Sequence, residues 1–379
     1  MKFSLEIIKD KCKGNGNARL GILHTAHGDI HTPCFMAVGT TAAMKAMHFD
    51  QLIDSGTEIM LCNTYHLMIQ ERYLTIEKLG GLHEFMNWQK PILTDCGGFQ
   101  AMSLSSLNKI TENAVTFRCH LSGKKYELTP ELSVDIQRRL DADISMALDE
   151  CVRQPAGYHY TKKAMERSLR WAKRSKDAFI SRDGYALYGI VQGGADKELR
   201  TQSINGLLDI GFDGYAIGGD LAVDNGWELM FNTFDYLTPM MDWEKPRYVM
   251  GVGKPIDIVG SVLRGIDQFD CVLPCRNARN GQAFTRNGVL NIKNSKYKYD
   301  KSKIDDSCKC RACSQHTRAY INHLFKANET LGAMLLTEHN ITYFQDLMKD
   351  IREAIKNEKM EEFAREYIEK FGKTNVDNK

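Results

Sequence analysis

Short apolar runs alternate along this chain with segments whose apolar residues recur at helical spacing. The runs occupy residues 58–62, 91–95, 144–149, 186–192, 214–219, 247–252 and 269–274, and the helical segments include 130–140, 161–179 and 196–210. Regular alternation of buried strands with helices is typical of a parallel sheet covered by helices. Seven such strands, with further candidates near the N-terminus, favour a closed eight-stranded barrel over an open sheet.

Polar and glycine residues follow most of these runs directly. They are Asp95-Cys96-Gly97-Gly98, Asp149-Glu150, Gln192-Gly193-Gly194, Gly218-Gly219-Asp220 and Gly251-Val252-Gly253. The carboxyl ends of barrel strands meet at one rim, where barrel enzymes carry their active sites. An open parallel sheet binds ligands at the same edge. The pattern therefore predicts an active site more strongly than it predicts closure of the barrel.

The composition adds limits on partners. The chain has 379 residues, of which 43% are hydrophobic, and a formal net charge of only +2. A globally basic nucleic-acid binder is not indicated, so any RNA contact must come from a local patch. Residues 286–311 carry an excess of positive charge, in Arg286, Lys293, Lys296, Lys298, Lys301, Lys303, Lys309 and Arg311. A solvated loop explains this segment as well as a binding patch does.

Cysteine usage and hydropathy indicate a compartment. Eight of the eleven cysteines are scattered along the chain without a spacing pattern, as expected of buried thiols in a reducing compartment. The first residues lack an apolar run of signal-peptide length, and no stretch approaches the roughly 18 apolar residues of a membrane span. We expect a soluble, cytoplasmic protein without a membrane partner.

The remaining cysteines form a cluster, Cys308-Lys-Cys310-Arg-Ala-Cys313. Clustered thiols in a reducing compartment usually serve a metal, although a fortuitous group of buried cysteines is an alternative. Four tetrahedral ligands close a structural zinc site, so a fourth ligand must come from further along the chain. His339 is the best candidate, because the nearer His316 and His323 lie on a predicted helix over residues 314–325.

Three carboxylates, Asp95, Asp149 and Asp270, each end an apolar strand. An isolated aspartate there is often only a helix N-cap. Three at one rim would be partly desolvated and would perturb one another, which suits an acid/base group beside a carboxylate nucleophile. Paired carboxylates suggest chemistry at a glycosidic carbon. Periodicity alone leaves open whether water, a sugar or a base is the acceptor.

Ten co-linear motifs resemble those of the bacterial-type tRNA-guanine transglycosylases, also called queuine tRNA-ribosyltransferases. They are AVGT (37–40), CNTYHL (62–67), LTDCGGFQAMSL (93–104), MALDEC (146–151), GIVQGG (189–194), YAIGG (215–219), YVMGVGKP (248–255), FDCVLPCRNARNGQAFT (269–285), the cysteine cluster and LGAMLLTEHN (331–340). Any one motif alone is weak, but ten in order are specific. The resemblance extends from about Leu20 to Phe371.

The resemblance implies the fold and the metal. The family is an irregular (β/α)8 TIM barrel, so residues 1–379 form one barrel domain. A zinc-binding subdomain, at residues 290–345, is inserted late in the barrel, and a C-terminal helix at 341–371 packs back on it. The resemblance makes His339 the fourth ligand beside Cys308, Cys310 and Cys313, and it implies one structural zinc per chain.

It also implies an activity and a mechanism. Guanine 34 in the anticodon of the tRNAs for Asp, Asn, His and Tyr is exchanged for a 7-deazaguanine, either preQ1 or queuine. By motif, Asp270 matches the nucleophile that forms a covalent glycosyl-enzyme. Asp95 matches the general acid/base that protonates departing guanine and deprotonates the incoming base. The enzyme is thus a pentosyltransferase acting on the tRNA anticodon loop.

Other positions match binding roles in the family. Those that match the base pocket are Phe99 and Met250 as a stacking sandwich, Asp149, Gln192 and Gly219 at the edge of the base, and Asp220 and Leu221 in the following loop. Asn63, Tyr248, Val38 and Val272 match the ribose pocket, and Arg276 and Arg279 match contacts to the RNA backbone. Relatives pair as homodimers, for which the region of His316, Tyr320 and His323 is the expected contact surface.

Several positions depart from the family pattern. The changed side chains are Cys96 for serine, Phe99 for tyrosine, and Cys275, Asn277 and Ala278 for threonine, serine and glycine. The loop after Gly219 has one extra residue and Asn225 in place of a glutamate that supports binding of the preQ1 amine. Asp220 could pair with that amine directly. Cys151 and Val223 match the preQ1-using pattern, so the choice between preQ1 and queuine stays open.

Three other functions are alternatives to a tRNA-guanine transglycosylase. A zinc-dependent hydrolase or glycosidase would need an open position on the metal, which four protein ligands exclude. A non-catalytic tRNA-docking subunit needs no nucleophile, whereas this chain keeps both Asp95 and Asp270. A related enzyme acting on another tRNA position or on DNA generally carries further RNA-binding domains or altered motifs.

Overall fold

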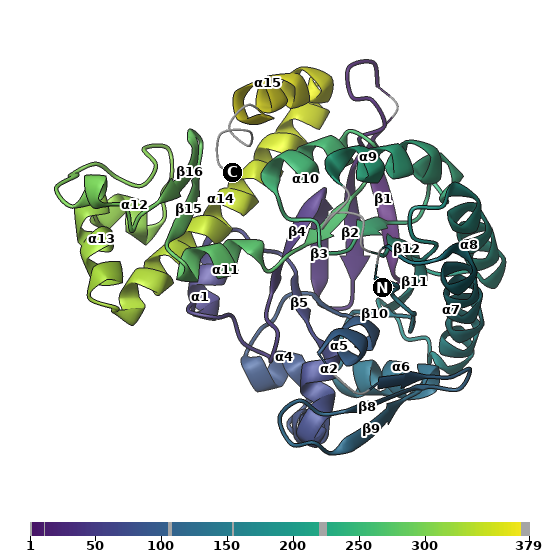
Figure 1. Ribbon diagram of the computed structural model, residues 1–379. Helices are drawn as coiled ribbons and strands as arrows, with labels where there is room; N and C mark the ends of the chain where they lie inside the picture. The colour runs from purple at the N-terminus through teal and green to yellow at the C-terminus, as the bar shows by residue number, and fades with distance from the viewer. Residues whose placement is uncertain (1, 11, 105–107, 154, 220–225, 373–379) are drawn as a thin grey trace.

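Eight parallel strands close into a barrel in the computed structural model, which describes residues 2–10, 12–104, 108–153, 155–219 and 226–372. The strands are β4 (Cys34–Val38), β5 (Met60–Cys62), β6 (Ile92–Thr94), β10 (Ile144–Met146), β11 (Ala186–Val191), β12 (Gly214–Ile217), β13 (Arg247–Val249) and β14 (Gln268–Asp270). Each run predicted from the sequence overlaps one of them, although β14 begins one residue before its predicted run and ends four residues before the end of that run. The eighth strand is β4, and the predicted (β/α)8 barrel is confirmed (Figure 1).

Closure of the barrel depends on the pairing of β14 with β4. Phe269 pairs with Phe35, and Asp270 pairs with Met36. Almost every residue of the eight strands is buried, because the barrel interior covers one face and the helices cover the other. This explains why the strands are continuous apolar runs rather than alternating ones.

The outer helices include three that the sequence predicted. They are α6 (Pro130–Arg139), α7 (Tyr158–Ala178) and α8 (Lys197–Ile210). Thr129 caps α6 by accepting from the Leu132 amide, and Asp196 caps α8 by accepting from the Leu199 amide. Further helices around the barrel are α1 (Phe49–Asp54), α2 (Thr64–Met68), α3 (Arg72–Lys78), α4 (Gly81–Met86), α9 (Gly226–Leu237) and α10 (Pro255–Val262). The described residues contain no helix long and apolar enough to cross a membrane.

Two small antiparallel sheets were not predicted. One contains β1 (Ser4–Lys9), β2 (Leu20–Thr25) and β3 (Gly28–Thr32). The other contains β7 (Asn108–Ile110), β8 (Val115–Arg118) and β9 (Lys125–Leu128), and it follows the short helix α5 (Gly98–Ser103). Exposed or half-buried residues interrupt these strands, so they lack the continuous apolar runs that identified the barrel strands.

A second hydrophobic centre lies in the late part of the chain. Its elements are α11 (Leu273–Arg279), β15 (Gln282–Thr285), β16 (Gly288–Asn291), α12 (Arg311–Gln315), α13 (Arg318–Lys326) and the start of the long helix α14 (Thr330–Lys356). The rest of α14 and the final helix α15 (Met360–Gly372) pack into an apolar cluster of the barrel. Figure 1 shows β15, β16, α12 and α13 beside the barrel, with α14 running back to it. The three clustered cysteines belong to this separate apolar cluster.

One expectation for this region needs correction. The helix predicted over residues 314–325 is two helices, because Thr317 caps α13 and His316 precedes that cap in an extended conformation. In the basic segment, two of the eight cations have acidic partners elsewhere in the chain. Arg286 pairs with Asp350 at 2.5 Å, and Arg311 lies 4.0 Å from Glu338.

Candidate active site

The three strand-end carboxylates lie at the same rim of the barrel. Asp95 follows β6, Asp149 follows β10, and Asp270 is the last residue of β14. In the closed ring, β6 is next to β10, whereas β14 is on the opposite side of the barrel from β10. Asp95 and Asp149 are buried and Asp270 is half-buried. The rim can therefore hold a ligand between one carboxylate on the β14 side and two on the other.

Asp95 is held by the segment that follows β5. The Asn63 amide donates to Oδ2 at 2.6 Å, and the Thr64 backbone N–H donates to Oδ1 at 2.8 Å. Burial raises the pKa of Asp95 to about 6, although both hydrogen bonds lower it, and the negative charge of Asp270 raises it further. A carboxyl group with this pKa can both give and take a proton near neutral pH.

Asp270 is fixed through one of its oxygens. The Tyr248 hydroxyl donates to Oδ1 at 2.5 Å, and the Gly251 amide donates to the same oxygen at 2.8 Å. Burial raises the pKa of Asp270, while these two hydrogen bonds lower it. Because both donors are on Oδ1, the carboxylate is oriented without the use of Oδ2.

Asp149 has a partner on each oxygen. The Gln192 amide, at the end of β11, donates to Oδ2 at 2.5 Å. The Cys96 thiol donates to Oδ1 at 3.2 Å, so the cysteine that departs from the family pattern contacts a predicted site residue directly. Burial raises the pKa of Asp149. Carboxylate and amide together present acceptors and a donor to the edge of a planar polar ligand.

Arg200 supports this side of the rim and was not identified from the sequence. Its fully buried guanidinium donates to the carbonyl of Gly194 at 2.6 Å and to that of Gly218 at 3.0 Å, which joins the loops after β11 and β12. Gly219 has a φ of +95°, which favours glycine, and a Cβ atom there would lie 2.9 Å from Arg200 Nη2. The available signal was an arginine on the apolar face of the predicted helix 196–210.

The other predicted side chains vary in exposure. The Phe99 ring is 50% exposed at the start of α5, and Met250 is partly buried just beyond β13. Val38 is buried and Val272 is 44% exposed. On α11, Arg276 is exposed and Arg279 donates to the Cys275 carbonyl. Asp220, Leu221, Val223 and Asn225 lie outside the described residues.

The clustered cysteines and His339 converge as the sequence predicted. Cys308, Cys310, Cys313 and His339 each offer a ligand atom, and these atoms lie within 4.8 Å of one another. Nδ1 of His339 is 3.3 Å from the Cys313 sulfur, while its Nε2 is 2.8 Å from the carbonyl of Phe284. Such a carbonyl fixes the ring so that Nδ1 points at a metal. Three thiols and an imidazole can hold a metal ion, and this donor set suits zinc.

A second group, His27, His83 and Asp143, lies at the opposite end of the barrel, just before β10. The two imidazole rings stack at 3.5 Å with 18° between their planes. Each ring places one of its nitrogen atoms beside the same carboxylate, that of Asp143. Nitrogen–oxygen distances of 2.9 and 3.2 Å to the buried Asp143 carboxylate make the group an ion-paired cluster.

A family model described as Queuine tRNA-ribosyltransferase matches residues 12–373 of this chain. The chain belongs to that family. Proteins named "Queuine tRNA-ribosyltransferase" from Rickettsia typhi and Ruegeria sp. are 55% and 54% identical to it over 355 and 341 residues. These alignments cover 94% and 90% of this chain and 97% and 90% of the relatives.

Membership in the queuine tRNA-ribosyltransferase family confirms the resemblance found in the ten motifs. The family name describes ribosyl transfer, so the chain is a member of a family of pentosyltransferase enzymes. The carboxylates at the barrel rim are suitably placed for such chemistry. The motifs could not show which groups hold these carboxylates and the neighbouring loops in place. The structure shows that Thr64 binds Asp95, that Cys96 binds Asp149, and that the buried Arg200 joins the loops after β11 and β12.

Proposed function

We propose that this protein is a tRNA-guanine transglycosylase that exchanges guanine 34 in the anticodon of the tRNAs for Asp, Asn, His and Tyr for a 7-deazaguanine. The observation that carries the proposal is the pair Asp95 and Asp270. Both are desolvated carboxylates with raised pKa values, and the charge of Asp270 acts on Asp95. A nucleophile and an acid/base group require such an arrangement at a glycosidic carbon.

In the first step Oδ2 of Asp270 attacks C1′ of the target nucleoside, because Oδ1 is held by Tyr248 and Gly251. The bond from C1′ to guanine N9 breaks, and protonated Asp95 gives its proton to the departing base. The product is a covalent glycosyl-aspartate. In the second step ionised Asp95 takes a proton from the incoming base, whose nitrogen attacks C1′ and releases Asp270.

The base is recognised on the side of the barrel opposite the nucleophile. Asp149 accepts from the N–H groups of the purine-like edge, and Gln192 with the Gly219 amide binds its carbonyl oxygen. Phe99 and Met250 stack on the two faces of the base, which replaces the stacking lost when it leaves the anticodon loop. Asn63, Tyr248, Val38 and Val272 surround the ribose.

Backbone recognition and assembly complete the proposal. Arg276 and Arg279 bind phosphates of the RNA, together with exposed lysines of the basic segment. A homodimer forms through the region of His316, Tyr320 and His323, where Tyr320 is 40% exposed and stacks on His316 at 5.0 Å. Monomeric, fully active protein in light scattering at micromolar concentration would contradict this assembly. Cys308, Cys310 and Cys313 are present as thiols, which suits a cytoplasmic location.

Cys308, Cys310, Cys313 and His339 hold one structural zinc, which supplies cross-linking rather than catalysis, since four protein ligands leave no open position. This also argues against a zinc-dependent hydrolase. The subdomain at residues 290–345 has its own small apolar cluster, and the metal compensates for the modest size of that core.

The incoming base is either preQ1 or queuine, and both carry an amine. Asp220 and Leu221 are proposed to contact it, as their motif positions imply. Competition of preQ1 and of queuine against labelled guanine already exchanged into tRNA distinguishes the two substrates by kcat/KM. Queuine that is inert where preQ1 saturates would exclude direct queuine use.

The reaction itself is tested by incubating tRNA transcripts with radiolabelled guanine. We expect label in the tRNA with the wild-type protein, and neither label nor a covalent RNA adduct with Asp270→Ala, which should still fold. Full exchange by Asp270→Ala would overturn the nucleophile assignment. Absence of exchange by the folded, metal-loaded wild-type protein would favour a tRNA-docking subunit instead.

A further inference from the structure

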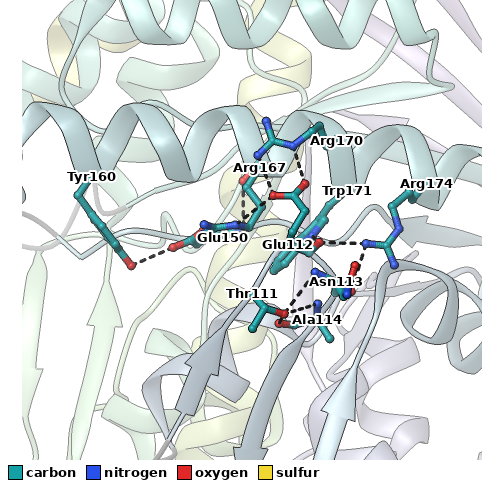
Figure 2. A network of polar contacts seen from close by, with 11 residues as sticks. Thr111, Glu112, Asn113, Ala114, Glu150, Tyr160, Arg167, Arg170, Trp171 and Arg174 are labelled. Carbon is teal, nitrogen blue, oxygen red and sulfur yellow. Dashed lines mark hydrogen bonds and ion pairs between the residues drawn. The ribbon is translucent and has the colours of Figure 1, made fainter.

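A second carboxylate is buried directly behind the base-reading one. Glu150 follows Asp149 in the chain and is only 1% exposed. Its two oxygens are bound from helix α7: the Tyr160 hydroxyl donates to Oε1 at 2.9 Å, and the Arg167 guanidinium donates to Oε2. Figure 2 shows Glu150 between these two side chains. A buried carboxylate is tolerated only where such partners neutralise it.

The same helix also holds the backbone on both sides of Asp149. The Leu148 amide donates to the Ser175 hydroxyl at 3.2 Å, and the Glu150 amide donates to the Ser168 hydroxyl at 2.9 Å. Together with Arg167, these contacts bracket Asp149 from α7. The position of the base-reading carboxylate therefore depends on how the end of β10 is fixed to that helix.

Arg167 also lies close to Glu112, in the turn between β7 and β8. Its Nε lies 3.8 Å from Oε2 of Glu112, which is also bound by Arg170 at 2.5 and 2.9 Å. Trp171 donates to the Glu112 carbonyl at 2.7 Å (Figure 2). Glu112 is 54% exposed and Glu150 is buried, so Arg167 is the described cation that reaches the inner carboxylate.

We propose that Arg167 is a positioning residue for base recognition, which fixes and neutralises Glu150 so that Asp149 can bind the edge of the incoming and departing base. The inference rests on the proposed function of Asp149. Arg167 contacts neither base nor ribose in this proposal. It acts through Glu150, and its loss should affect affinity for the base before it affects the chemical step.

The electrostatic consequence follows from the groups around Asp149. These are the Cys96 thiol, the neutral Gln192 amide and Glu150, whose negative charge raises the pKa of Asp149. Glu150 in turn faces Tyr160 and Arg167. Without the guanidinium, the Glu150 charge acts on Asp149 uncompensated, so Asp149 takes up a proton at higher pH. A protonated Asp149 no longer accepts from two N–H groups.

The test compares guanine exchange into tRNA by Arg167→Met, Arg167→Lys and the double variant Glu150→Gln/Arg167→Met. We expect Arg167→Met to raise KM for guanine about tenfold, with a smaller change in kcat, and to move the acid limb of kcat/KM to higher pH. Arg167→Lys should retain most of the affinity. The double variant should restore the wild-type KM and the wild-type position of the acid limb, because it also removes the uncompensated charge of Glu150.

Arg170→Met is the matched control, since Arg170 shares Glu112 but has no described contact with Glu150. This variant should lose the exposed ion pair between α7 and Glu112, while KM for guanine stays unchanged. Denaturation midpoints of all variants separate misfolding from misplacement. Unchanged KM and pH limb in folded Arg167→Met, or a double variant no better than the single one, would overturn the inference. Failure of the proposed function is distinct, because the wild type would then exchange no guanine.

Discussion

The Tyr248 hydroxyl donates a 2.5 Å hydrogen bond to Oδ1 of Asp270 from β13, the strand adjacent to the one that Asp270 ends. Neighbouring strands of a parallel barrel end at the same rim, so this pairing follows from the register of β13 with β14. The hydroxyl stabilises the ionised carboxylate and lowers its pKa against the effect of burial. The proposed nucleophile is thus kept both ionised and oriented.

Tyr248→Phe should therefore slow exchange without loss of the fold. A hydrogen bond to a charged group contributes about 1.5–3 kcal/mol, which corresponds to a decrease in kcat of roughly 10- to 100-fold. Removal of the donor raises the pKa of Asp270, so the acid limb of kcat should move to higher pH. A pH–rate profile checks this. Tyr188→Phe is the control, because that hydroxyl binds Gln268 inside the barrel; an equal loss in both variants would contradict a specific role.

Asp95→Asn should abolish turnover and yet stabilise the protein at neutral pH. The folded-state pKa of about 6 lies above the ordinary 3.8, so ionisation of Asp95 destabilises the fold as pH rises from about 4 through 6. Asparagine carries no charge and avoids that cost, but it loses one hydrogen-bond acceptor for Asn63 or Thr64. The free energy of unfolding should therefore increase by about 1–2 kcal/mol above pH 7. Urea unfolding at pH 4 and pH 7.5 measures it, and a gain that does not grow with pH would be contrary evidence.

The Cys96 thiol is expected to orient Asp149. Cys96→Ala removes its donor and should raise KM for guanine about threefold to tenfold, as loss of one modest hydrogen bond implies. Cys96→Ser keeps a donor and should behave like the wild type. Steady-state kinetics with both variants provides the measurement. Cys34→Ala removes a buried thiol at the start of β4, at the end of the barrel opposite the rim, and controls for the cavity. Equal KM in the wild type and all three variants would exclude a role of Cys96 in orienting Asp149.

Metal removal should affect stability of the late subdomain. Wild-type protein is expected to contain about one zinc per chain, and Cys313→Ala should lose it. A chain of 379 residues loses roughly 1–2 °C of Tm for each kcal/mol, and loss of a structural zinc removes several kcal/mol, so a fall of about 5 °C or more is expected. Metal analysis and thermal unfolding test this, with Cys34→Ala as a buried cysteine outside the cluster. Zinc-free protein with unchanged Tm and full activity would refute a structural role.

Much of the barrel could be predicted because its signals are local. Strands such as β11 and β12 are buried on both faces, so they are continuous apolar runs, and α8 has an N-cap aspartate at Asp196. The strands β7 to β9 could not be identified in this way, because exposed and half-buried residues interrupt them. The prediction of one helix over residues 314–325 was wrong, because Thr317 begins a new helix as its N-cap although the apolar residues continue at helical spacing.

The sequence by itself determined which chemical groups stand at strand ends, the three-cysteine spacing and the order of the family motifs, since each depends on residues close together in the chain. Only the tertiary structure decided that Asp270 lies across the barrel from Asp149 and that Arg167 neutralises Glu150, whereas His339 was already predicted to join the cysteine cluster. These relations join residues far apart in sequence through closure of β14 on β4 and packing of α7 and α14. The pKa shifts belong to the same class, because desolvation depends on everything packed around a group rather than on its neighbours in the chain.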